Sequence, residues 1–397
     1  MFDPAVFVLT EVRGRNRAAN TIGIVLRSLV AFYLFLDLRG IDLDKRLGIG
    51  ELLSLAEVED LARLCRLPLN ELAVLSGETE NIVPKVVSLE KVRMGAPGKP
   101  RFDVAPEVAA SRLRYIRTYL HWIAFERLSR HGLDASVVAR LNDSSRLVRE
   151  AIDARIPRKR GHSALNQREG LSEDAVAELL RVIDPHSPDN PWNDQHARYR
   201  NILLIHWLLF LGVRIGEALG VRIDDIVIRQ KEVTIHRRAD DPDDPRRLQP
   251  QTKTRARVLP LNDALLLETQ SYIHNHRGVL TGAKRHPFLF VASRTGHPMT
   301  MAAVGKLFKD LRDGCPSLPR TTSAHLLRHT WNDAFSKKME EAGIAPEKEQ
   351  QARNYLMGWS PTSDTAAVYT RRYVRNKAKE VSIELQNQLI NRDQNDE

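Results

Sequence analysis

The first 157 residues carry the hydrophobic period of α-helices. Apolar side chains recur at positions 22, 26, 29, 33 and 36, with spacings of three and four that place them on one helical face. The ranges 51–67 and 106–128 repeat this period, and Pro106 suits the first turn of a helix. The pattern therefore predicts an all-α N-terminal domain over residues 1–157. The buried stripe predicted for the last of these helices consists of Leu113, Ile116, Leu120 and Ile123.

The second part of the chain mixes two periods. Helical spacing dominates 197–219, whereas 225–228 and 232–236 alternate apolar and polar residues as strands do. A third strand is predicted over 255–261, and helical spacing returns after it. These patterns predict a mainly α fold with a small antiparallel β-sheet, that is, an α+β domain. The insert before the third strand, 239–250, is acidic and rich in proline, which predicts an exposed surface loop.

A basic linker separates the two parts. No acidic residue interrupts the Lys and Arg side chains between Arg155 and Arg168, and proline, glycine and serine disfavour a helix there. Ser172 follows as a candidate helix N-cap, with acidic residues in the favourable first turn. We therefore predict a first domain at 1–157, a linker at 158–170, a second domain at 171–380 and a tail at 381–397.

Composition excludes several classes of protein. The 397 residues include 42% hydrophobic and 28% charged side chains, which excludes an intrinsically disordered chain and, at this length, predicts at least two domains. Cys65 and Cys315 are too few for a disulfide framework or a four-ligand zinc site, so we expect a reducing, cytoplasmic environment. The N-terminus lacks the order of a signal peptide, and the longest apolar run, 202–213, is shorter than the roughly 20 residues of a membrane span. We therefore expect no membrane association.

The net charge indicates a class of partner. The 60 Lys and Arg residues exceed the 50 Asp and Glu residues, giving a net charge of +10. Such a surplus favours nucleic acid as a partner, and the alternative is a solvated basic surface. Arginines opposite an apolar stripe are also a common solvated face. The candidate contacts with a DNA backbone are two side chains of the 106–128 helix and three of the linker: Arg114, Arg117, Arg158, Lys159 and Arg160.

Four short segments bring together residue types that can carry chemistry. Taken singly, each has a structural explanation, such as an ion pair of Arg214 with Glu217 or a tyrosine packed in a core. His325 and His329 share a helical face, but their segment lacks the Glu of a metalloprotease helix and Arg328 would repel a cation, so we predict no metal site. The segments are LGVRIGEALGVRIDDI with Arg214, QTKTRARVLPL with Lys253, AHLLRHT with His325 and Arg328, and YLMGWSPTSDTAAVYTRRY with Trp359 and Tyr369.

Taken together, the four segments match the chemistry of displacement at a phosphodiester. Negative charge grows on the non-bridging oxygens in the transition state, where two arginine forks, a histidine and an indole N–H can stabilise it. A tyrosine, whose ordinary pKa is about 10, needs such a cationic environment to act as a nucleophile. A lysine on a hairpin can supply the proton that the leaving 5′-oxygen requires. This set of residues needs neither a metal nor a nucleotide cofactor.

Residues 171 to about 372 resemble the catalytic domain of the tyrosine recombinase (phage integrase) family. LFLGVRIGEALGVRIDDI is similar to the family's first arginine box, whereas AHLLRHT, MGWS and AVYT are similar to its second. The helical part before them resembles the family's core-binding domain. By position, the resemblance implies that Arg214 is the first catalytic arginine, Lys253 the hairpin lysine, His325 and Arg328 the His-x-x-Arg pair, Trp359 the equivalent of a second histidine or a tryptophan, and Tyr369 the nucleophile.

Two features depart from the family pattern. Trp359 and Tyr369 are ten positions apart where nine is usual, and an extra residue in the turn near Pro361 would account for the difference. Tyr373, one helical turn further on, is the rival nucleophile. The spacing after the hairpin lysine is also slightly irregular, yet Arg255 cannot readily replace that lysine as a proton donor because the pKa of a guanidinium is too high.

The resemblance implies a C-shaped clamp that cuts and rejoins double-stranded DNA through a 3′-phosphotyrosyl intermediate, without metal or ATP. The expected partners are a specific recombination site, further copies of the chain in a homotetramer on paired sites, and accessory DNA-bending proteins. We expect the protein to be DNA-associated in the cytoplasm. Val381, Leu385 and Leu389 share one face of the tail, which predicts either docking on a neighbouring subunit or a frayed terminus.

Two alternatives to a site-specific recombinase or integrase remain open. One is a DNA-binding regulator on the same fold that does not cleave DNA, and the intact set of site residues counts against it. The other is a type IB topoisomerase, which uses similar chemistry as a monomer. The separate helical domain and the apolar tail favour recombination over relaxation of supercoils.

Overall fold

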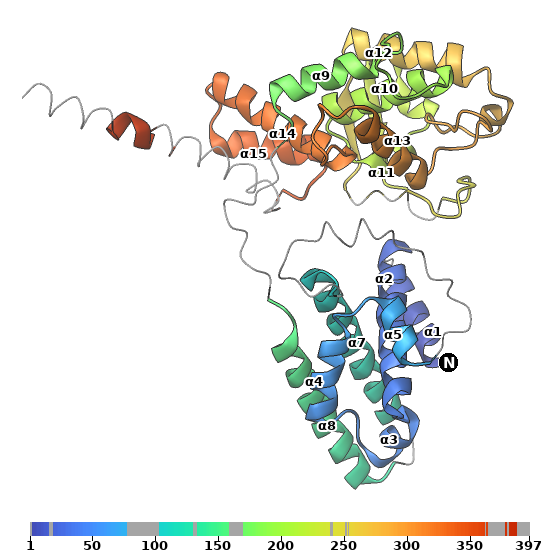
Figure 1. Ribbon diagram of the computed structural model, residues 1–397, viewed down its shortest axis with the longest axis vertical. Coiled ribbons are helices and arrows are strands. Elements are labelled where there is room, and N and C mark those ends of the chain that lie inside the picture. The colour runs from blue at the N-terminus through green and yellow to red at the C-terminus, as the bar shows by residue number, and fades with distance from the viewer. Residues whose placement is uncertain are drawn as a thin grey trace, which may run out of the picture. The chain divides into compact units, whose positions relative to one another are not determined.

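The computed structural model describes residues 2–15, 19–77, 103–129, 133–158, 170–238, 241–250, 252, 254–361, 363, 378 and 381–386. The chain divides into two compact units, Met1–Leu165 and Asn166–Glu397 (Figure 1). Each unit has a hydrophobic core of its own. The division falls within the basic segment 158–170, of which 159–169 lie outside the described residues.

The described part of the first unit is entirely helical, as its hydrophobic period predicts. Local capping explains where several helices begin. The Ser54 hydroxyl accepts the N–H of Glu57 at 3.3 Å, and the Glu57 carboxylate accepts the N–H of Ser54 at 2.8 Å. The elements are α1 Phe2–Phe7, a π-helical segment Val8–Arg13, α2 Ala19–Arg39, α3 Leu43–Ile49, α4 Leu55–Leu64, α5 Leu69–Leu75, α7 Pro106–Leu128 and α8 Ala135–Arg155.

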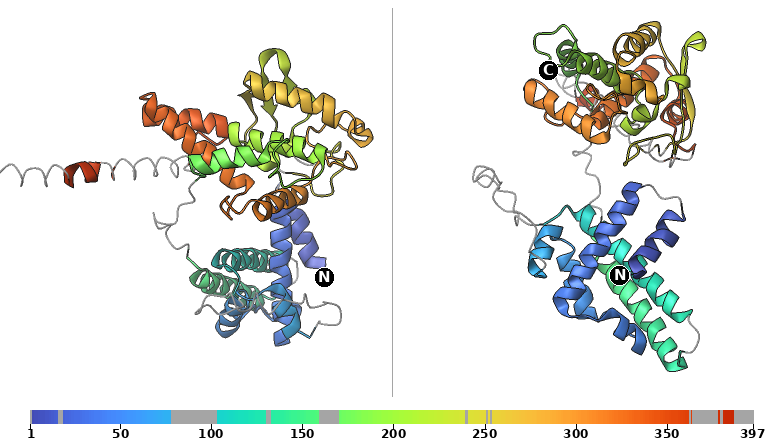
Figure 2. Two further views of the ribbon diagram at one scale, coloured as in Figure 1. Left: turned by 45° about the horizontal axis from the view of Figure 1, so that its top comes forward. Right: turned by 90° about the vertical axis from the view of Figure 1, so that its right-hand side faces the viewer.

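Helix α7 lies at the centre of this unit and packs against both α2 and α8 (Figure 2). Its predicted stripe is buried, with at most 3% of each of the four side chains exposed. The stripe predicted for α2 is partly wrong, because Leu26 is 44% exposed whereas Val25, Phe32 and Phe35 are fully buried. Helix α2 is apolar on most of its circumference, so its period alone does not determine which face meets the core.

Helix α2 also corrects the prediction about the longest apolar segment. Its stretch Thr21–Arg39 has a mean hydropathy of 1.8 and, by length and composition alone, matches a membrane span. In the structure its side chains Val25, Leu29 and Phe32 are buried in the core of the first unit. This packing is that of a core helix, which passes the same test of length and composition.

The second unit is mainly helical. Its central helix α10, Gln195–Phe210, is buried on nearly all sides, and the indole N–H of Trp207 donates to Thr269 Oγ1 at 3.2 Å. Ser172 caps α9 as predicted, because its hydroxyl accepts the N–H of Ala175 at 3.2 Å. The other helical elements are α9 Glu173–Ile183, α11 Ile215–Gly220, α12 Asp263–Ser271, α13 Met301–Gly314, α14 Ala324–Glu341 and α15 Pro346–Met357, with short 3₁₀ and π segments between them.

A three-stranded antiparallel sheet accompanies these helices, as predicted. Strands β1 Ile226–Val227, β2 Glu232–Ile235 and β3 Arg257–Pro260 follow one another in the order β1-β2-β3. The register pairs Val233 with Leu259, and the strands are shorter than the hydrophobic pattern predicts. In β3 the side chains on the buried face are Arg257 and Leu259. A guanidinium therefore lies on the face of the strand that packs against the core.

The insert between β2 and β3 corrects the expectation of an exposed loop. Asp244 and Arg246 are only 9% and 7% exposed, and their side chains pair at 2.8 Å. Arg222 similarly binds Asp241 at 2.5 Å. The acidic composition is misleading because the acids of this segment are matched by arginines that lie close by in the fold.

Candidate active site

Arg214 lies at the junction of α10 and α11, where the backbone leaves little freedom. It occupies the N-cap position of α11 in an extended conformation. Two residues earlier, Gly212 has a φ of +61°, and a Cβ added there would lie 2.6 Å from the ring of Trp331. Glycine therefore meets two requirements at this turn, the left-handed backbone and the close approach of the indole. Both requirements fix the direction in which the Arg214 side chain leaves the helix start.

The centre of the site is the buried carboxylate of Glu217, which is 2% exposed. It accepts the backbone N–H of Arg214 at 2.9 Å and Nη2 of Arg257 at 2.7 Å, and it also binds the hydroxyl of Thr254. Burial alone would raise the pKa of Glu217, but the hydrogen bond from Arg257 and the charge of Arg328 bring that pKa below its ordinary value. Glu217 is therefore an anion that holds cationic side chains from three segments of the chain.

Arg328, on α14, is a second cation at this centre. Its Nη1 lies 3.9 Å from Glu217 Oε2 and donates to the carbonyl oxygen of Gly212 at 2.6 Å. Its guanidinium also lies 5.6 Å from the ring centroid of Trp359. The side chain is 2% exposed. Arg328 thus joins the start of α11 to the segment after α15, and the predicted neighbours Arg214, Arg328 and Trp359 meet in one place.

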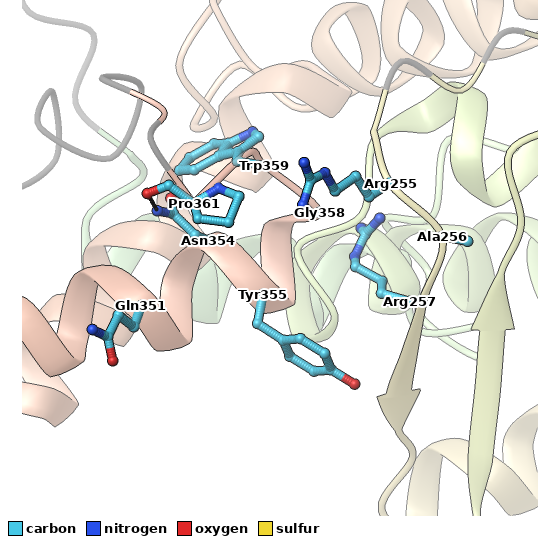
Figure 3. Close-up of a pocket in the computed structure, with 9 residues that line it drawn as sticks. All are labelled: Arg255, Ala256, Arg257, Gln351, Asn354, Tyr355, Gly358, Trp359 and Pro361. Atoms are coloured by element: carbon cyan, nitrogen blue, oxygen red, sulfur yellow. Dashed lines mark hydrogen bonds between the residues drawn. The ribbon is translucent and has the colours of Figure 1, made fainter.

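Trp359 follows a tight turn that brings β3 to the end of α15 (Figure 3). Gly358 has a φ of +65°, and a Cβ added there would lie 2.7 Å from Arg257 Nη1 and 2.9 Å from the carbonyl oxygen of Arg255. The backbone N–H of Arg255 donates to the carbonyl oxygen of Gly358 at 2.9 Å. The side chains around this turn, Tyr355 among them, line a pocket of about 300 Å³ beside the indole.

His325 begins the same helix that carries Arg328, and its imidazole is exposed. Its Nε2 lies 3.1 Å from Nε2 of His329, and the two rings meet edge to face. One of the two nitrogens must donate and the other accept, so the hydrogen positions of the two rings are coupled. Helix α14 therefore carries an exposed imidazole one turn before Arg328.

Lys253, Tyr369 and the rival Tyr373 lie outside the described residues. The residue after Lys253, Thr254, is buried and donates to Glu217, so the chain enters the site directly after the lysine. After Trp359, the N–H of Ser363 donates to the carbonyl oxygen of Ser360 at 2.9 Å. A turn therefore exists at the place where the extra residue before Tyr369 was expected.

The sequence patterns missed Glu217, Arg257 and Thr254 as site residues. Glu217 was considered only as an ion-pair partner of Arg214, and the two side chains do approach to 3.6 Å. The overlooked signal was the strand alternation, which places Arg257 in the same buried row as Leu259. A buried guanidinium requires a buried anion, and Glu217 provides it.

The predicted DNA contacts in the first unit differ in their surroundings. Arg114 is exposed on α7, whereas Arg117 forms an ion pair with Asp153 on α8. Arg158 is exposed at the end of the described segment, and Lys159 and Arg160 lie outside the described residues. One of the arginines predicted to contact DNA, Arg117, is therefore paired with an acid of its own unit.

Comparison with known proteins identifies a family whose model matches most of the second unit. A family model described as the phage integrase family matches residues 169–375. Solved structures to which the chain shows similarity include XerA recombinase, with 17% identity over 68% of this chain and 82% of that chain and a TM-score of 0.38. The Tn1549 transposon integrase in complex with circular intermediate DNA shows 18% identity over 76% and 87%, with a TM-score of 0.42.

A third structure is the XerH site-specific recombinase bound to a palindromic difH substrate, with 15% identity over 91% of this chain and 96% of that chain and a TM-score of 0.44. A comparison with curated proteins gives no match. The family model spans more than half of the 397 residues and contains the cluster around Glu217. The chain therefore belongs to the phage integrase family of tyrosine recombinases.

Proposed function

We propose that the protein is a site-specific DNA recombinase that cuts and rejoins strands through a 3′-phosphotyrosyl link to Tyr369. One observation carries the proposal. Arg214 Nη1 is enclosed and lies 3.6 Å from Glu217 Oε1, beyond hydrogen-bond distance, and among the residues that the structure describes it has no hydrogen-bond acceptor. Buried donors are rarely left without an acceptor, so this atom suits an anion that the substrate would bring. A phosphate oxygen is such an anion, and arginine is suited to bind it.

The cluster around Glu217 supplies the electrostatics of the reaction. Arg214 and Arg328 stabilise the charge that develops on the non-bridging oxygens of the scissile phosphate. Glu217 holds these cations close together against their mutual repulsion, so they need little rearrangement when the phosphate arrives. His325, on the same helix as Arg328, and the indole of Trp359, which follows α15, add further donors.

In the proposed reaction, Tyr369 Oη forms a bond to phosphorus while the bond from phosphorus to the 5′-oxygen breaks. The proton of the tyrosine hydroxyl is released, and Lys253 donates a proton to the departing 5′-oxygen. The 5′-hydroxyl of the exchanged strand then attacks the phosphorus, and the bond from phosphorus to Tyr369 Oη breaks. The phosphodiester is restored, and the tyrosine oxygen takes up a proton. The energy of the broken bond stays in the protein–DNA link, so the reaction needs neither ATP nor a metal ion.

The proposal includes partners and an assembly. The substrate is double-stranded DNA, with Arg114, Arg158, Lys159 and Arg160 on its backbone. Paired sites recruit a homotetramer, and accessory DNA-bending proteins assist it in the cytoplasm. The tail docks on a neighbouring copy, and two of its apolar side chains, Val381 and Leu385, are exposed in the described segment.

Capture from a randomised pool of nicked duplexes tests this function. A nick next to the scissile phosphate lets a short strand diffuse away, so the covalent adduct accumulates and survives denaturation by detergent. We expect the wild type and Tyr373→Phe to capture a duplex and Tyr369→Phe to capture none. Capture by Tyr369→Phe but not by Tyr373→Phe would move the nucleophile to Tyr373, and no capture by the wild type would overturn the proposal.

The captured duplex then distinguishes recombination from the two alternatives. We expect two such sites on one plasmid to give recombined products. Relaxation of a supercoiled plasmid without strand exchange would instead assign a type IB topoisomerase. Specific binding without any adduct would assign a regulator.

A further inference from the structure

The connection between β2 and β3 carries the proposed proton donor and is long. It runs from the residue after Ile235 to the residue before Arg257, and it includes Lys253. A free loop of this length would give the lysine many positions, and holding it at the leaving oxygen would then cost conformational entropy. The contacts of the described part of this connection show how it is held.

Arg246 fastens the connection to the core of the second unit. Its Nη1 donates to the carbonyl oxygens of Leu219 and Met299 at 3.0 and 2.9 Å, and its Nε and Nη2 bind the Asp244 carboxylate at 2.8 Å. The guanidinium also lies 4.5 Å from the ring centroid of Phe288. We call Asp244 and Arg246, with these two carbonyl oxygens, the clip.

Two further contacts close the loop around the clip. The side-chain amide of Gln249 binds both backbone groups of Asp241, accepting its N–H at 2.9 Å and donating to its carbonyl oxygen at 2.7 Å. Arg222 holds the carboxylate of the same residue at 2.5 Å. The segment from Asp241 to Gln249 is therefore a closed ring that is fixed to the body of the unit.

The connection is anchored again immediately after Lys253. Thr254 is 4% exposed and donates to Glu217, so only residues 250–253 separate it from Gln249. Both anchors rest on α11, because the clip reaches the carbonyl oxygen of Leu219 and Thr254 reaches Glu217. The same helix has Arg214 as its N-cap, so one short element holds both sides of the lysine segment and the first arginine.

We propose that the clip is a positioning device for Lys253, which it holds near the 5′-oxygen that leaves the scissile phosphate. A buried ion pair adds little to stability when compared with apolar side chains of similar volume, whereas it fixes a geometry well. The inference rests on the proposed function. Asp244 and Arg246 do not touch the substrate; they act through the lysine, which donates its proton as the bond from phosphorus to the 5′-oxygen breaks.

A change of leaving group tests this role. The substrate is the duplex that the wild type captures covalently, prepared with either oxygen or sulfur at the 5′-bridging position. A thiol has a pKa near 8.5, far below that of an alcohol, so sulfur leaves without a donated proton. Single-turnover cleavage of both duplexes is measured for the wild type, Arg246→Met, Gln249→Ala and Lys253→Ala. Arg247→Ala, which removes an exposed charge from the same loop, is the matched control for weakened DNA attraction.

We expect Arg246→Met to slow cleavage of the oxygen duplex by about ten- to 100-fold and to cleave the sulfur duplex within about twofold of the wild-type rate. Lys253→Ala should show the same pattern, and Gln249→Ala a weaker form of it. Arg247→Ala should cleave both duplexes at the wild-type rate once the DNA is saturating. If Arg246→Met does not fold, as shown by the loss of a cooperative thermal transition, the cleavage of the two duplexes by Gln249→Ala tests the positioning role instead.

Equal slowing of the clip variants on both duplexes, or no slowing on either, would overturn the positioning role. Failure of sulfur to rescue Lys253→Ala would overturn it as well, since the lysine would then not be the proton donor. A wild type that cleaves neither duplex would overturn the proposed function itself, and with it the inference.

Discussion

The two units are stabilised by different kinds of core. In the described part of the first unit the core is mainly apolar and buries one charged side chain, Arg112, whose guanidinium donates to the carbonyl oxygens of Cys65 and Leu67. The described part of the second unit buries Arg200, Glu217, Asp225, Asp244, Arg246, Arg257, Arg277, Arg328, Glu349 and Arg353.

This difference indicates where the chemistry lies. Apolar side chains pack without regard to charge, and many arrangements of similar volume are tolerated. Buried charges are costly unless each has its partner, so they tolerate only one arrangement and hold the donors of a site in place. The apolar core of the first unit is thus a scaffold, whereas the buried cations of the second unit are held in one arrangement.

The largest effect is expected from loss of the carboxylate at the centre of the second unit. Glu217→Ala leaves Arg257 as a buried charge without its partner, which should lower the free energy of unfolding by about 3–5 kcal/mol. Urea denaturation of the full chain measures this loss. Glu173→Ala, which removes an exposed partner of Lys337 in the first turn of α9, should shift the midpoint far less, and an equal effect of the two variants would contradict the comparison.

An apolar truncation in the first unit should affect stability but not chemistry. Leu120→Ala removes a buried side chain of α7 and should cost about 3 kcal/mol through the cavity that it leaves. The folded variant, at saturating DNA, should cleave the captured duplex at the wild-type rate. A cleavage rate that falls by tenfold or more would show that the scaffold contributes to the chemical step.

The glycine before the first arginine tests the backbone of the site. Gly212→Ala forces a side chain into a left-handed conformation and against the ring of Trp331, which should cost about 1–3 kcal/mol and slow cleavage. Gly220→Ala is the matched control at the other end of α11, because an added Cβ there meets no atom within 4 Å. Wild-type stability and cleavage in both variants would show that the site does not require glycine at position 212.

Acid should destabilise the second unit through a buried histidine. Burial, together with the charge of Arg200, lowers the pKa of His196 to about 4, whereas an unfolded histidine titrates near 6.5. Between these values the unfolded chain binds a proton that the folded chain does not, so stability falls as the pH falls from about 6.5 to 4. Urea midpoints across this range should fall less for His196→Gln than for the wild type, whereas exposed His274→Gln should follow the wild type.

The smallest effects are expected at the surface of the first unit. Arg117→Ala removes one partner of an ion pair that is partly exposed, which should cost less than about 1 kcal/mol. Arg114→Ala should instead weaken DNA binding and reduce the slope of its salt dependence by about one counterion. Urea denaturation measures the loss of stability in Arg117→Ala, and binding of the captured duplex at several salt concentrations measures the slope for both variants. A larger change in slope for Arg117→Ala than for Arg114→Ala would reverse their roles.

Much of this structure follows from period and spacing. The stripe of α7 could be predicted because its four apolar side chains recur at spacings of three and four, and the small antiparallel sheet because three short segments have the pattern of strands. The separate boxes predicted that Arg214, Arg328 and Trp359 belong to one site, and the structure brings them together.

What the sequence could not show depends on partners that are distant along the chain. Glu217 and Arg257 are forty positions apart, and no local pattern indicates that they share a buried hydrogen bond. The acidic insert looked exposed because its arginines could not be assigned to its acids from composition. On α2, apolar residues occupy so much of the circumference that only packing against α7 determines which face is buried.

Identification of the residue bonded to DNA tests the central claim most directly. The detergent-stable adduct of the wild type with the captured duplex is digested with protease and nuclease, and the nucleotide-bearing peptide is sequenced by mass spectrometry. We predict a nucleotide joined through its 3′-phosphate to Tyr369. A link to Tyr373 or to any other residue, or a 5′-phosphate link, would contradict the account.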